Sequence, residues 1–423
     1  MVASCKRCED PPGPAADASR DVAAVVVTEV ASDASLEAPH DAGPAADATE
    51  TTAEPYGDAG TSTCRLVYGP AEQPFRGPAA LSVSGTTLRL ITNEAGKPRI
   101  YPVAIAPVPP KGAPAFVPPR PSTFIGMRWP PCELAGRFVY CQAPGGPILR
   151  SVLVAEGDRV TSEAVKTIAK SRSGTRIAAA SLGAEHAVVA FLDVRRTTEG
   201  EMLQAFVALD EREPVHLSED GAGATTVRFL PRGDQPVAVY LDTRTSMVPI
   251  HARPVSLRAN DLGLGSDAVV FVGGAPERGI DFTVANAGAK SFAFVPMPRE
   301  TIDFGMAVLP IEDPPKDDIP ATWSLYPNGV DPAPIAAAPA RDGKGAWIAR
   351  IRPRERAPGS PRILELGRVD VAGAFSSYGE VAPGKGVTDV AVIEDGSGGV
   401  WILYGDTSIT WLERRVCPAP PPT

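Results

Sequence analysis

The sequence predicts an all-β protein built from one repeated unit, and three observations support this. A short apolar segment recurs seven times, with anchors at Leu90, Tyr140, Ala190, Val239, Phe294, Ala349 and Leu403. The steps between anchors are 50, 50, 49, 55, 55 and 54 residues, and a near-constant period indicates a repeat architecture. Short alternating runs lie around the anchors, in a chain with 40 Gly and 46 Pro. Finally, the seventh repeat is one strand short, and one unclaimed strand lies near the start of the chain.

Each repeat carries four predicted strands, because each period contains four apolar or alternating runs bounded by Gly, Pro or Asp. The innermost strands are expected at 79–84, 122–129, 176–182, 225–230, 280–285, 334–338 and 388–394. The anchors mark the second strands. The third strands are expected at 99–105, 148–155, 202–209, 247–255, 306–311, 362–371 and 408–416. The fourth are expected at 116–117, 166–169, 215–217, 269–272, 322–326 and 375–378.

The unclaimed strand, residues 64–68, can complete the last repeat by pairing with residues 408–416. Such pairing closes the array and hides both of its edges, which an open sheet must otherwise protect. Four-stranded antiparallel units arranged radially form a β-propeller. We therefore predict a seven-bladed β-propeller of four-stranded antiparallel blades over residues 62–418, closed by the N-terminal strand. A pair of packed β-sandwiches is the alternative, but the even spacing and the missing strand favour the propeller.

Two turn segments resemble the repeats of two-component regulator sensor propellers. Residues 394–402 read Glu-Asp-Gly-Ser-Gly-Gly-Val-Trp-Ile, and residues 341–348 read Arg-Asp-Gly-Lys-Gly-Ala-Trp-Ile. Only two of the seven repeats carry this pattern, so the resemblance implies the fold and not a sensor function. The Gly-His and Trp-Asp pairs of WD40 repeats are absent from the sequence, and the Ser-x-Asp box of sialidase propellers is not cleanly present.

Residues 1–61 differ from the rest of the chain in composition and charge. Twelve acids and three bases in residues 1–60 account for the whole net charge of -9, so the remaining chain is neutral. A segment dominated by Ala, Asp, Pro, Glu and Thr cannot bury enough apolar surface to fold, which predicts a disordered acidic tether. Residues 419–423 form a short C-terminal tail. The neutral globular part argues against nucleic acid as a partner, and the sequence has no run of eighteen apolar residues.

The first residues, Val2-Ala3-Ser4-Cys5, resemble the lipobox of bacterial lipoproteins. The tether likewise resembles the Ala/Asp/Pro-rich stalks of bacterial surface lipoproteins. No apolar segment precedes Cys5, so either the true start lies upstream of Met1 or the match is accidental. The resemblance implies lipidation at Cys5 and an exported protein of the cell envelope or the extracellular space. Membrane association would then depend on that anchor alone.

Four of the six cysteines lie where disulfides are expected. Cys64 opens the closing strand, and Cys417 ends the strand that it should pair with. Cys132 and Cys141 flank one hairpin. The pairs Cys64–Cys417 and Cys132–Cys141 predict an oxidising compartment, whereas four separate buried thiols are the alternative. Cys5 and Cys8 match Cys-x-x-Cys without a second pair, so no metal site is predicted.

One set of charged residues recurs after the second strands of successive repeats. Its members are Asp193, Arg195, Asp242, Arg244, Arg299, Arg352 and Arg354. In a propeller the loops that join strands two and three share one face with the connections between blades, so these residues could form a ligand-binding ring. Arginine presents forked donors that suit carboxylates or phosphates. The alternative is structural, with Asp–Arg pairs holding loops or neighbouring blades together.

No catalytic set is evident, because the sequence lacks a Gly-x-Ser-x-Gly elbow and its four histidines are not at ligand spacing from one another. We predict a monomeric, non-catalytic binding module without cofactor or metal, which recognises a protein or glycan through one face. The alternative is an enzyme, a glycan hydrolase or lyase that uses Arg and carboxylate side chains at the channel mouth.

Overall fold

A computed structural model describes most of the chain from residue 62 onward. The described residues are 62–123, 130–156, 159–171, 176–197, 200–218, 223–242, 248–259, 261–273, 282–298, 304–317, 320–326, 334–354, 361–384, 386–406 and 408–418. All of them belong to one compact unit, Pro55–Thr423. The predicted tether, the lipidation site Cys5 and the end of the C-terminal tail lie outside the described residues.

The described elements are all β-strands. In the first three blades they are β2 (Ala80–Ser84), β3 (Thr87–Glu94) and β4 (Lys97–Ala104), then β5 (Glu133–Ala135), β6 (Phe138–Gln142), β7 (Pro147–Glu156) and β8 (Arg159–Lys170), then β9 (Ala178–Leu182), β10 (His186–Thr197), β11 (Gly200–Leu209) and β12 (Val215–His216). Blade four contains β13 (Ala224–Leu230), β14 (Val237–Asp242), β15 (Val248–Arg258), β16 (Asp261–Leu264) and β17 (Ala268–Gly273).

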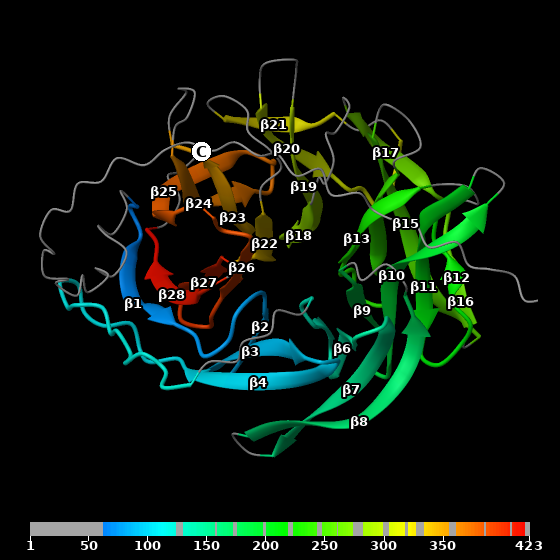
Figure 1. Cartoon of the computed structure of the whole chain (residues 1–423). Coiled ribbons are helices and arrows are strands. Elements are labelled where there is room, and N and C mark those ends of the chain that lie inside the picture. Colours follow the sequence, from blue (N-terminus) through cyan, green and yellow to red (C-terminus); the bar gives the residue numbers. More distant parts are fainter. Residues whose placement is uncertain are drawn as a thin grey trace, which may run out of the picture. The chain divides into compact units, whose positions relative to one another are not determined.

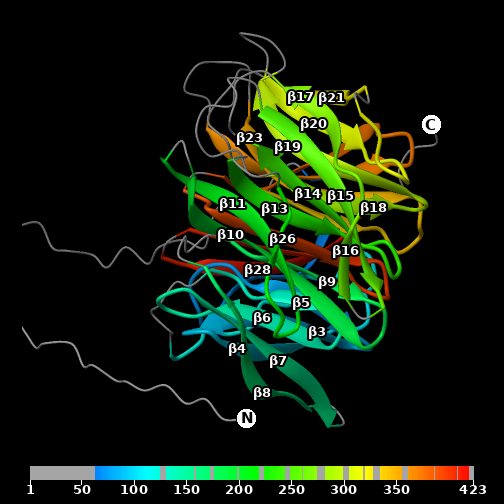
Figure 2. The same cartoon turned by 90° about the vertical axis from the view of Figure 1, so that its right-hand side faces the viewer.

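The remaining blades complete the ring. Blade five holds β18 (Thr283–Ala287), β19 (Lys290–Pro298), β20 (Phe304–Pro310) and β21 (Thr322–Tyr326); blade six holds β22 (Ile335–Pro339), β23 (Gly345–Pro353), β24 (Arg362–Asp370) and β25 (Phe375–Pro383). Blade seven holds β26 (Asp389–Glu394), β27 (Gly399–Gly405), β28 (Thr410–Val416) and β1 (Arg65–Glu72). Figure 1 shows the seven sheets around a common axis, and Figure 2 shows the same sheets from the side.

The closure by the N-terminal strand is confirmed. β1 pairs antiparallel with β28, which lies between β27 and β1 in the sheet. A disulfide joins Cys64 to Cys417 across 353 residues of sequence, at the end of this strand pair. The second predicted disulfide, Cys132–Cys141, is also present. The prediction that the first strand completes the last blade is therefore correct, and it follows from edge protection.

The hydrophobic core explains why the ring has to close. The buried side chains of the described residues fall into seven clusters, and each cluster lies between two consecutive blades. One of them joins the last blade to the first, through Trp401 and Leu403 on β27 and Leu88 and Leu90 on β3. Every blade thus buries both faces, as its strands with apolar residues on both sides require. Two separate β-sandwiches would not give one core per pair of neighbours.

The first blade departs from the prediction of four strands. Its sheet contains β2, β3 and β4, and the expected fourth strand at residues 116–117 is wrong. The backbone N–H of Ile105 donates to the carbonyl of Thr86, which fixes the register of β4 so that even-numbered residues direct their N–H away from β3. Two of these residues are Pro98 and Pro102, which have no N–H to donate. The outer edge of β4 therefore lacks donors for another strand.

The segment after β4 instead covers the outside of the seventh blade. Phe116 forms a parallel bridge with Tyr68 in β1, and the backbone of Gly69 donates to the carbonyl of Phe116 at 2.8 Å. The side chain of Arg65 donates to the carbonyls of Pro109 and Pro110. We call residues 105–120 the strap. Because the strap protects the edge of β1 with a proline-rich segment, the closing strand is held from both sides.

Two other elements differ from the predicted ones. The inner strand of blade two was expected at 122–129, of which 124–129 lie outside the described residues. The structure places this strand at β5, in the stretch predicted to be a hairpin turn. Blade four has a fifth strand, because β16 and β17 both pair with β15. The long hairpin of β7 and β8 extends beyond the neighbouring blades (Figures 1 and 2).

Candidate functional site at the channel mouth

The ring has two faces with different contents. The turns between strands one and two, and between strands three and four, lie on one face, which we call the hairpin face. The turns between strands two and three, and the connections between blades, lie on the opposite face, which we call the loop face. This division follows from the antiparallel order of strands in each blade. Ligand sites in such rings are expected on loops held by a rigid scaffold.

A pocket on the loop face combines residues from three blades. It is lined by Gly77, Pro78 and Ala79 before β2, by Asp389, Val390 and Ala391 in β26, by Leu403, Tyr404 and Gly405 in β27, by Thr410 in β28 and by Arg176 before β9. Arg176 belongs to blade three, whereas the other lining residues belong to blades seven and one. A side chain from blade three that meets these residues must reach across the mouth of the central channel. We call this the channel-mouth pocket.

The polar groups of the channel-mouth pocket are of both signs. Arg176 offers guanidinium donors and is half-buried, and Asp389 offers carboxylate acceptors from the start of β26. The hydroxyl of Thr388 donates to Asp389 Oδ2 at 3.1 Å, which orients the carboxylate. The cavity volume is about 10 Å³, so the pocket has room for one water-sized group, such as a single hydroxyl of a larger ligand that lies over the mouth.

The wall of the pocket at β27 is held in place from behind. Tyr404 is buried, and its phenol hydroxyl lies 3.5 Å from Glu413 Oε2. Burial raises the pKa of Glu413, although the neighbouring Arg415 favours its ionised form through a contact of 2.6 Å between Nε and Oε1. Arg415 in turn donates to the carbonyls of Cys64 and Val381. The ring of Tyr404 packs in the core between blades six and seven, so this side of the pocket rests on a buried charge pair at the closure of the ring.

The floor of the pocket is a backbone contact between blades seven and one. Thr410 Oγ1 accepts from the backbone N–H of Gly77 at 3.0 Å and donates to its carbonyl at 3.2 Å. Gly77 has a φ of 96°, a conformation that side chains other than glycine rarely adopt. The pocket therefore lies over the junction that closes the ring.

None of the described members of the predicted Asp–Arg set lines this pocket. Asp193 and Arg195 lie in β10 and not in a loop, so their expected position is corrected. Asp193 is buried, Arg195 Nε lies 3.5 Å from its carboxylate, and the guanidinium covers the ring of Phe206 at 4.7 Å. The Arg195 side chain is still 49% exposed. This contact matches the structural alternative, and it leaves part of Arg195 open to solvent.

The two described arginines of blade six also contact carboxylates, which lie on other strands of the same blade. Arg352 lies at the end of β23, and its Nε is 2.9 Å from Glu365 Oε1 on β24. Arg354 binds Glu380 on β25 through two contacts, of 2.6 and 3.0 Å. Both pairs join strands within one blade. The sequence identified the arginines, whereas their partners depend on the register between strands.

The remaining members of the set are only partly described. Asp242 ends β14, is buried and lies 3.9 Å from Nε2 of His251, whose Nδ1 faces Asp267 at 3.0 Å. Arg244 and Arg299 lie outside the described residues. Among the described residues no group of His, Cys, Asp and Glu has an arrangement that could hold a metal ion. In the same part of the chain no helix is long and apolar enough to cross a membrane.

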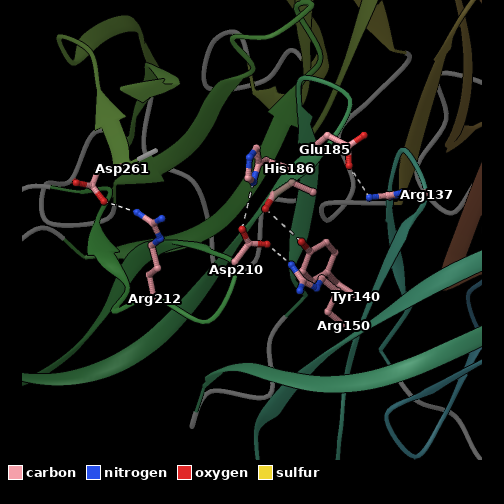
Figure 3. Close-up of polar contacts among 9 residues, drawn as sticks. Arg137, Tyr140, Arg150, Glu185, His186, Asp210, Arg212 and Asp261 are labelled. Atoms are coloured by element: carbon pink, nitrogen blue, oxygen red, sulfur yellow. Dashed lines mark hydrogen bonds and ion pairs between the residues drawn. The ribbon is translucent and has the colours of Figure 1, made fainter. Parts of the chain in front are cut away.

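The hairpin face carries a second polar cluster, drawn in Figure 3. Asp210, in the turn after β11, accepts from Arg150 of blade two, and its other oxygen lies 3.3 Å from His186 Nδ1. Arg137 in blade two contacts Glu185 in blade three at 2.7 Å. The contacts of Arg150 with Asp210 and of Arg137 with Glu185 cross from blade two to blade three, whereas His186 and Asp210 both belong to blade three. The two crossing contacts form a seam between blades two and three.

Sequence analysis missed Arg176 and Asp389, the two charged groups of the channel-mouth pocket. Both occupy equivalent places, just before or at the start of the innermost strand of their blades. In a ring of blades, the starts of the innermost strands surround the axis on the loop face. The predicted strands and the predicted closure of the ring could therefore have identified these positions as lining the channel mouth. What could not be read is which blades face one another across the mouth.

Comparisons with known proteins bear on the fold only. No protein-family model matches the chain, and no curated protein matches it. Among solved structures it is similar to the fungal lectin of Aleuria aurantia, described as a six-bladed β-propeller with a novel mode of fucose recognition (13% identity, TM-score 0.37, covering 69% of this chain and 95% of the lectin). It is also similar to Trypanosoma rangeli sialidase in complex with 2,3-difluorosialic acid (10% identity, TM-score 0.43, covering 79% of this chain and 59% of the sialidase). Likeness at this level carries no argument about what this chain binds.

Proposed function

We propose that the protein is a non-catalytic binding module that recognises a glycan lying over the channel-mouth pocket. The observation that carries this proposal is that Arg176 of blade three lines the same pocket as Asp389 of blade seven, from opposite sides of the channel. A sugar presents hydroxyl groups that both donate and accept hydrogen bonds. A guanidinium and a carboxylate at the rim of one pocket can meet both needs.

The alternative, a glycan hydrolase, has less support from the pocket. Hydrolysis of a glycosidic bond ordinarily uses two carboxyl groups on either side of the bond. Among the described residues that line the pocket, Asp389 is the one carboxylate. A binding role needs no second carboxylate, and we therefore prefer it.

The predicted Asp–Arg set has a place in this proposal as an outer part of the same face. Arg195 is half exposed and Arg354 has an exposed fraction of 50%, so both can meet a ligand while keeping their carboxylate partners. We propose in addition that the protein acts as an exported monomer, tethered through residues 1–61 and lipidated at Cys5. Two disulfides support an oxidising location.

The test is a glycan panel probed with purified protein, with binding and product release both recorded. Arg176→Gln and Asp389→Asn should each weaken binding of the glycan that the wild type selects by about tenfold or more, since charge-assisted hydrogen bonds are lost. Glu213→Gln, an exposed carboxylate on the hairpin face, is the matched control and should change nothing. Release of a shortened glycan by the wild type, lost in Asp389→Asn, would instead establish the hydrolase.

A further inference from the structure

The loop face around blades one and two carries cations without partners. Within the described residues, Arg76, Lys97 and Lys170 are exposed and make no side-chain hydrogen bond or ion pair. Elsewhere on the ring the arginines of the seams and of blade six are neutralised by carboxylates. A cation that is left exposed and unpaired on the face of a proposed binding site is available to a ligand.

These cations form a path that begins at the channel mouth. Arg76 lies directly before Gly77, which lines the channel-mouth pocket. Lys97 is the first residue of β4, directly after Gly96 in the turn that follows β3. A side chain at Gly96 would collide with Ala143, so this turn packs directly on the turn between β6 and β7 in blade two.

Lys170 continues the path on the far side of that same turn. It ends β8, and the backbone N–H of the next residue, Ser171, donates to the carbonyl of Gly146 at 2.8 Å. Lys97 and Lys170 therefore flank the turn of residues 143–146, which contains no charged residue. The path runs from the pocket over blade one to the outer strand of blade two.

The acids near the path are fewer and mostly engaged. Glu94, opposite Lys97 in the strand pair, is bound by Arg99 at 3.2 Å, and Glu72 is bound by Arg120 at 3.4 Å. Arg196 and Glu201 of blade three lie opposite each other in neighbouring strands, and their opposite charges cancel, so they do not extend the path. The positive excess is thus local to blades one and two, although the globular part as a whole is neutral.

We infer that the ligand of this face is an acidic polysaccharide that carries carboxylates, with one sugar over the channel-mouth pocket and the following sugars along Arg76, Lys97 and Lys170. This inference rests on the proposed function. Asp389 in the pocket favours hydroxyl groups over phosphate, because a carboxylate repels a second anion at contact. Carboxylates spaced along a sugar chain meet separate cations, and their hydroxyl groups meet the pocket.

The experiment measures affinity for a galacturonic acid oligomer, for a neutral maltose-type oligomer of equal length and for polyphosphate. The wild type should bind the acidic oligomer most tightly, with an affinity that falls as salt rises. The triple variant Arg76→Gln, Lys97→Gln, Lys170→Gln should lose about tenfold or more of that affinity. The matched control is Arg258→Gln, Lys290→Gln, Lys344→Gln, which removes three exposed cations from the hairpin face and should bind as the wild type does.

The outcomes separate this inference from the proposed function. If the triple variant binds the acidic oligomer unchanged while Arg176→Gln loses it, the pocket is confirmed and the path is wrong. If neither variant affects binding of any oligomer, both are wrong. Equal loss in the triple variant and its control, or polyphosphate bound as tightly as the acidic oligomer, would show general attraction of anions and would overturn the assignment to a carboxylated sugar.

Discussion

Two turns of the hairpin face begin with the same pattern and are stabilised differently. In blade seven, Asp395 accepts from the backbone N–H groups of Ser397 and Gly399, from Trp401 Nε1 at 2.8 Å and from Arg414 Nε at 2.7 Å. Its side chain is fully buried. The turn is thus built around one carboxylate, and every partner of that carboxylate belongs to the same blade.

In blade six the equivalent Asp342 is 43% exposed and has fewer partners. It accepts from Arg368 at 2.5 and 2.7 Å and from the backbone of Lys344 at 2.9 Å. Trp347 donates not to Asp342 but to Glu394 of blade seven, at 2.8 Å. The turn of blade six lacks one residue between its Asp and Trp, which moves the indole toward the next blade. The same motif therefore builds a turn in one blade and a contact between blades in the other.

The largest effect is expected from Asp395→Ala. Removing this carboxylate leaves Arg414 buried without its counter-charge and the backbone donors of the turn without an acceptor. We expect a loss of about 3–5 kcal/mol in the free energy of unfolding, measured by guanidinium denaturation. A loss below about 1 kcal/mol would mean that the turn is not organised by this carboxylate.

Trp401→Phe should cost less, about 2 kcal/mol, because Asp395 keeps Arg414 and loses one donor. The variant also leaves space in the core between blades seven and one. Trp347→Phe is the matched change in blade six and should cost about 1 kcal/mol, since Glu394 keeps the backbone donor of Arg341. Equal losses in the two variants would contradict the distinction drawn between the two turns.

Asp342→Ala should cost about 1 kcal/mol, because nearly half of its carboxylate is already solvated. Denaturation under the conditions used for Asp395→Ala gives the comparison directly. If Asp342→Ala proved as damaging as Asp395→Ala, exposure would not explain the difference between the turns.

The smallest expected effect concerns how steeply the free energy of unfolding falls as the pH is lowered below about 4. Burial alone would raise the pKa of Asp395, but hydrogen bonds from Ser397, Arg414 and Gly399 outweigh it and hold the pKa below its usual range. Asp342 is shifted downward as well, through Arg368 and the backbone of Lys344, which again outweigh burial. The stability that these two groups contribute is complete above the unfolded pKa of about 3.9 and is lost as pH falls through the folded values.

Asp395→Asn should therefore reduce the loss of stability between about pH 4 and pH 2, relative to its own stability at pH 6. Glu413 acts in the opposite direction, because its pKa is raised and its protonation favours the folded state. Unfolding curves at several pH values measure the slope. If the free energy of unfolding of Asp395→Asn falls with pH as steeply as that of the wild type, other carboxylates control the loss of stability in acid.

Much of the fold could be predicted because it depends on two features that the sequence shows. One is the repeated pattern of short apolar strands, and the other is the need for the ring of blades to close. The period of about fifty residues gave the number of blades, and the missing strand gave the closure of β1 on β28. The pairing of Cys64 with Cys417 followed from that closure. The strand at 116–117 was predicted wrongly because an apolar pair in a proline-rich segment suits an edge of any blade, and its position in sequence favoured blade one.

The site was harder to predict for a physical reason. Asp193 and Arg195 are separated by one residue and contact each other, so a local pattern finds them. Arg176 and Asp389 lie more than two hundred residues apart and meet only through the geometry of the ring. The partners of Arg352 and Arg354, Glu365 and Glu380, depend on strand register, which short alternating segments leave open.

The position of β28 between β27 and β1 has a consequence for the synthesis of the chain. The first strand of the ring has no neighbour in its sheet until residues 410–416 have left the ribosome, and the strap has no docked strand to cover until then. Blades two to six can form as the chain emerges, but the core between blades seven and one is assembled last. A nonsense mutation shortly before residue 410 would therefore remove one strand from the protein and deprive a second, at the opposite end, of its place.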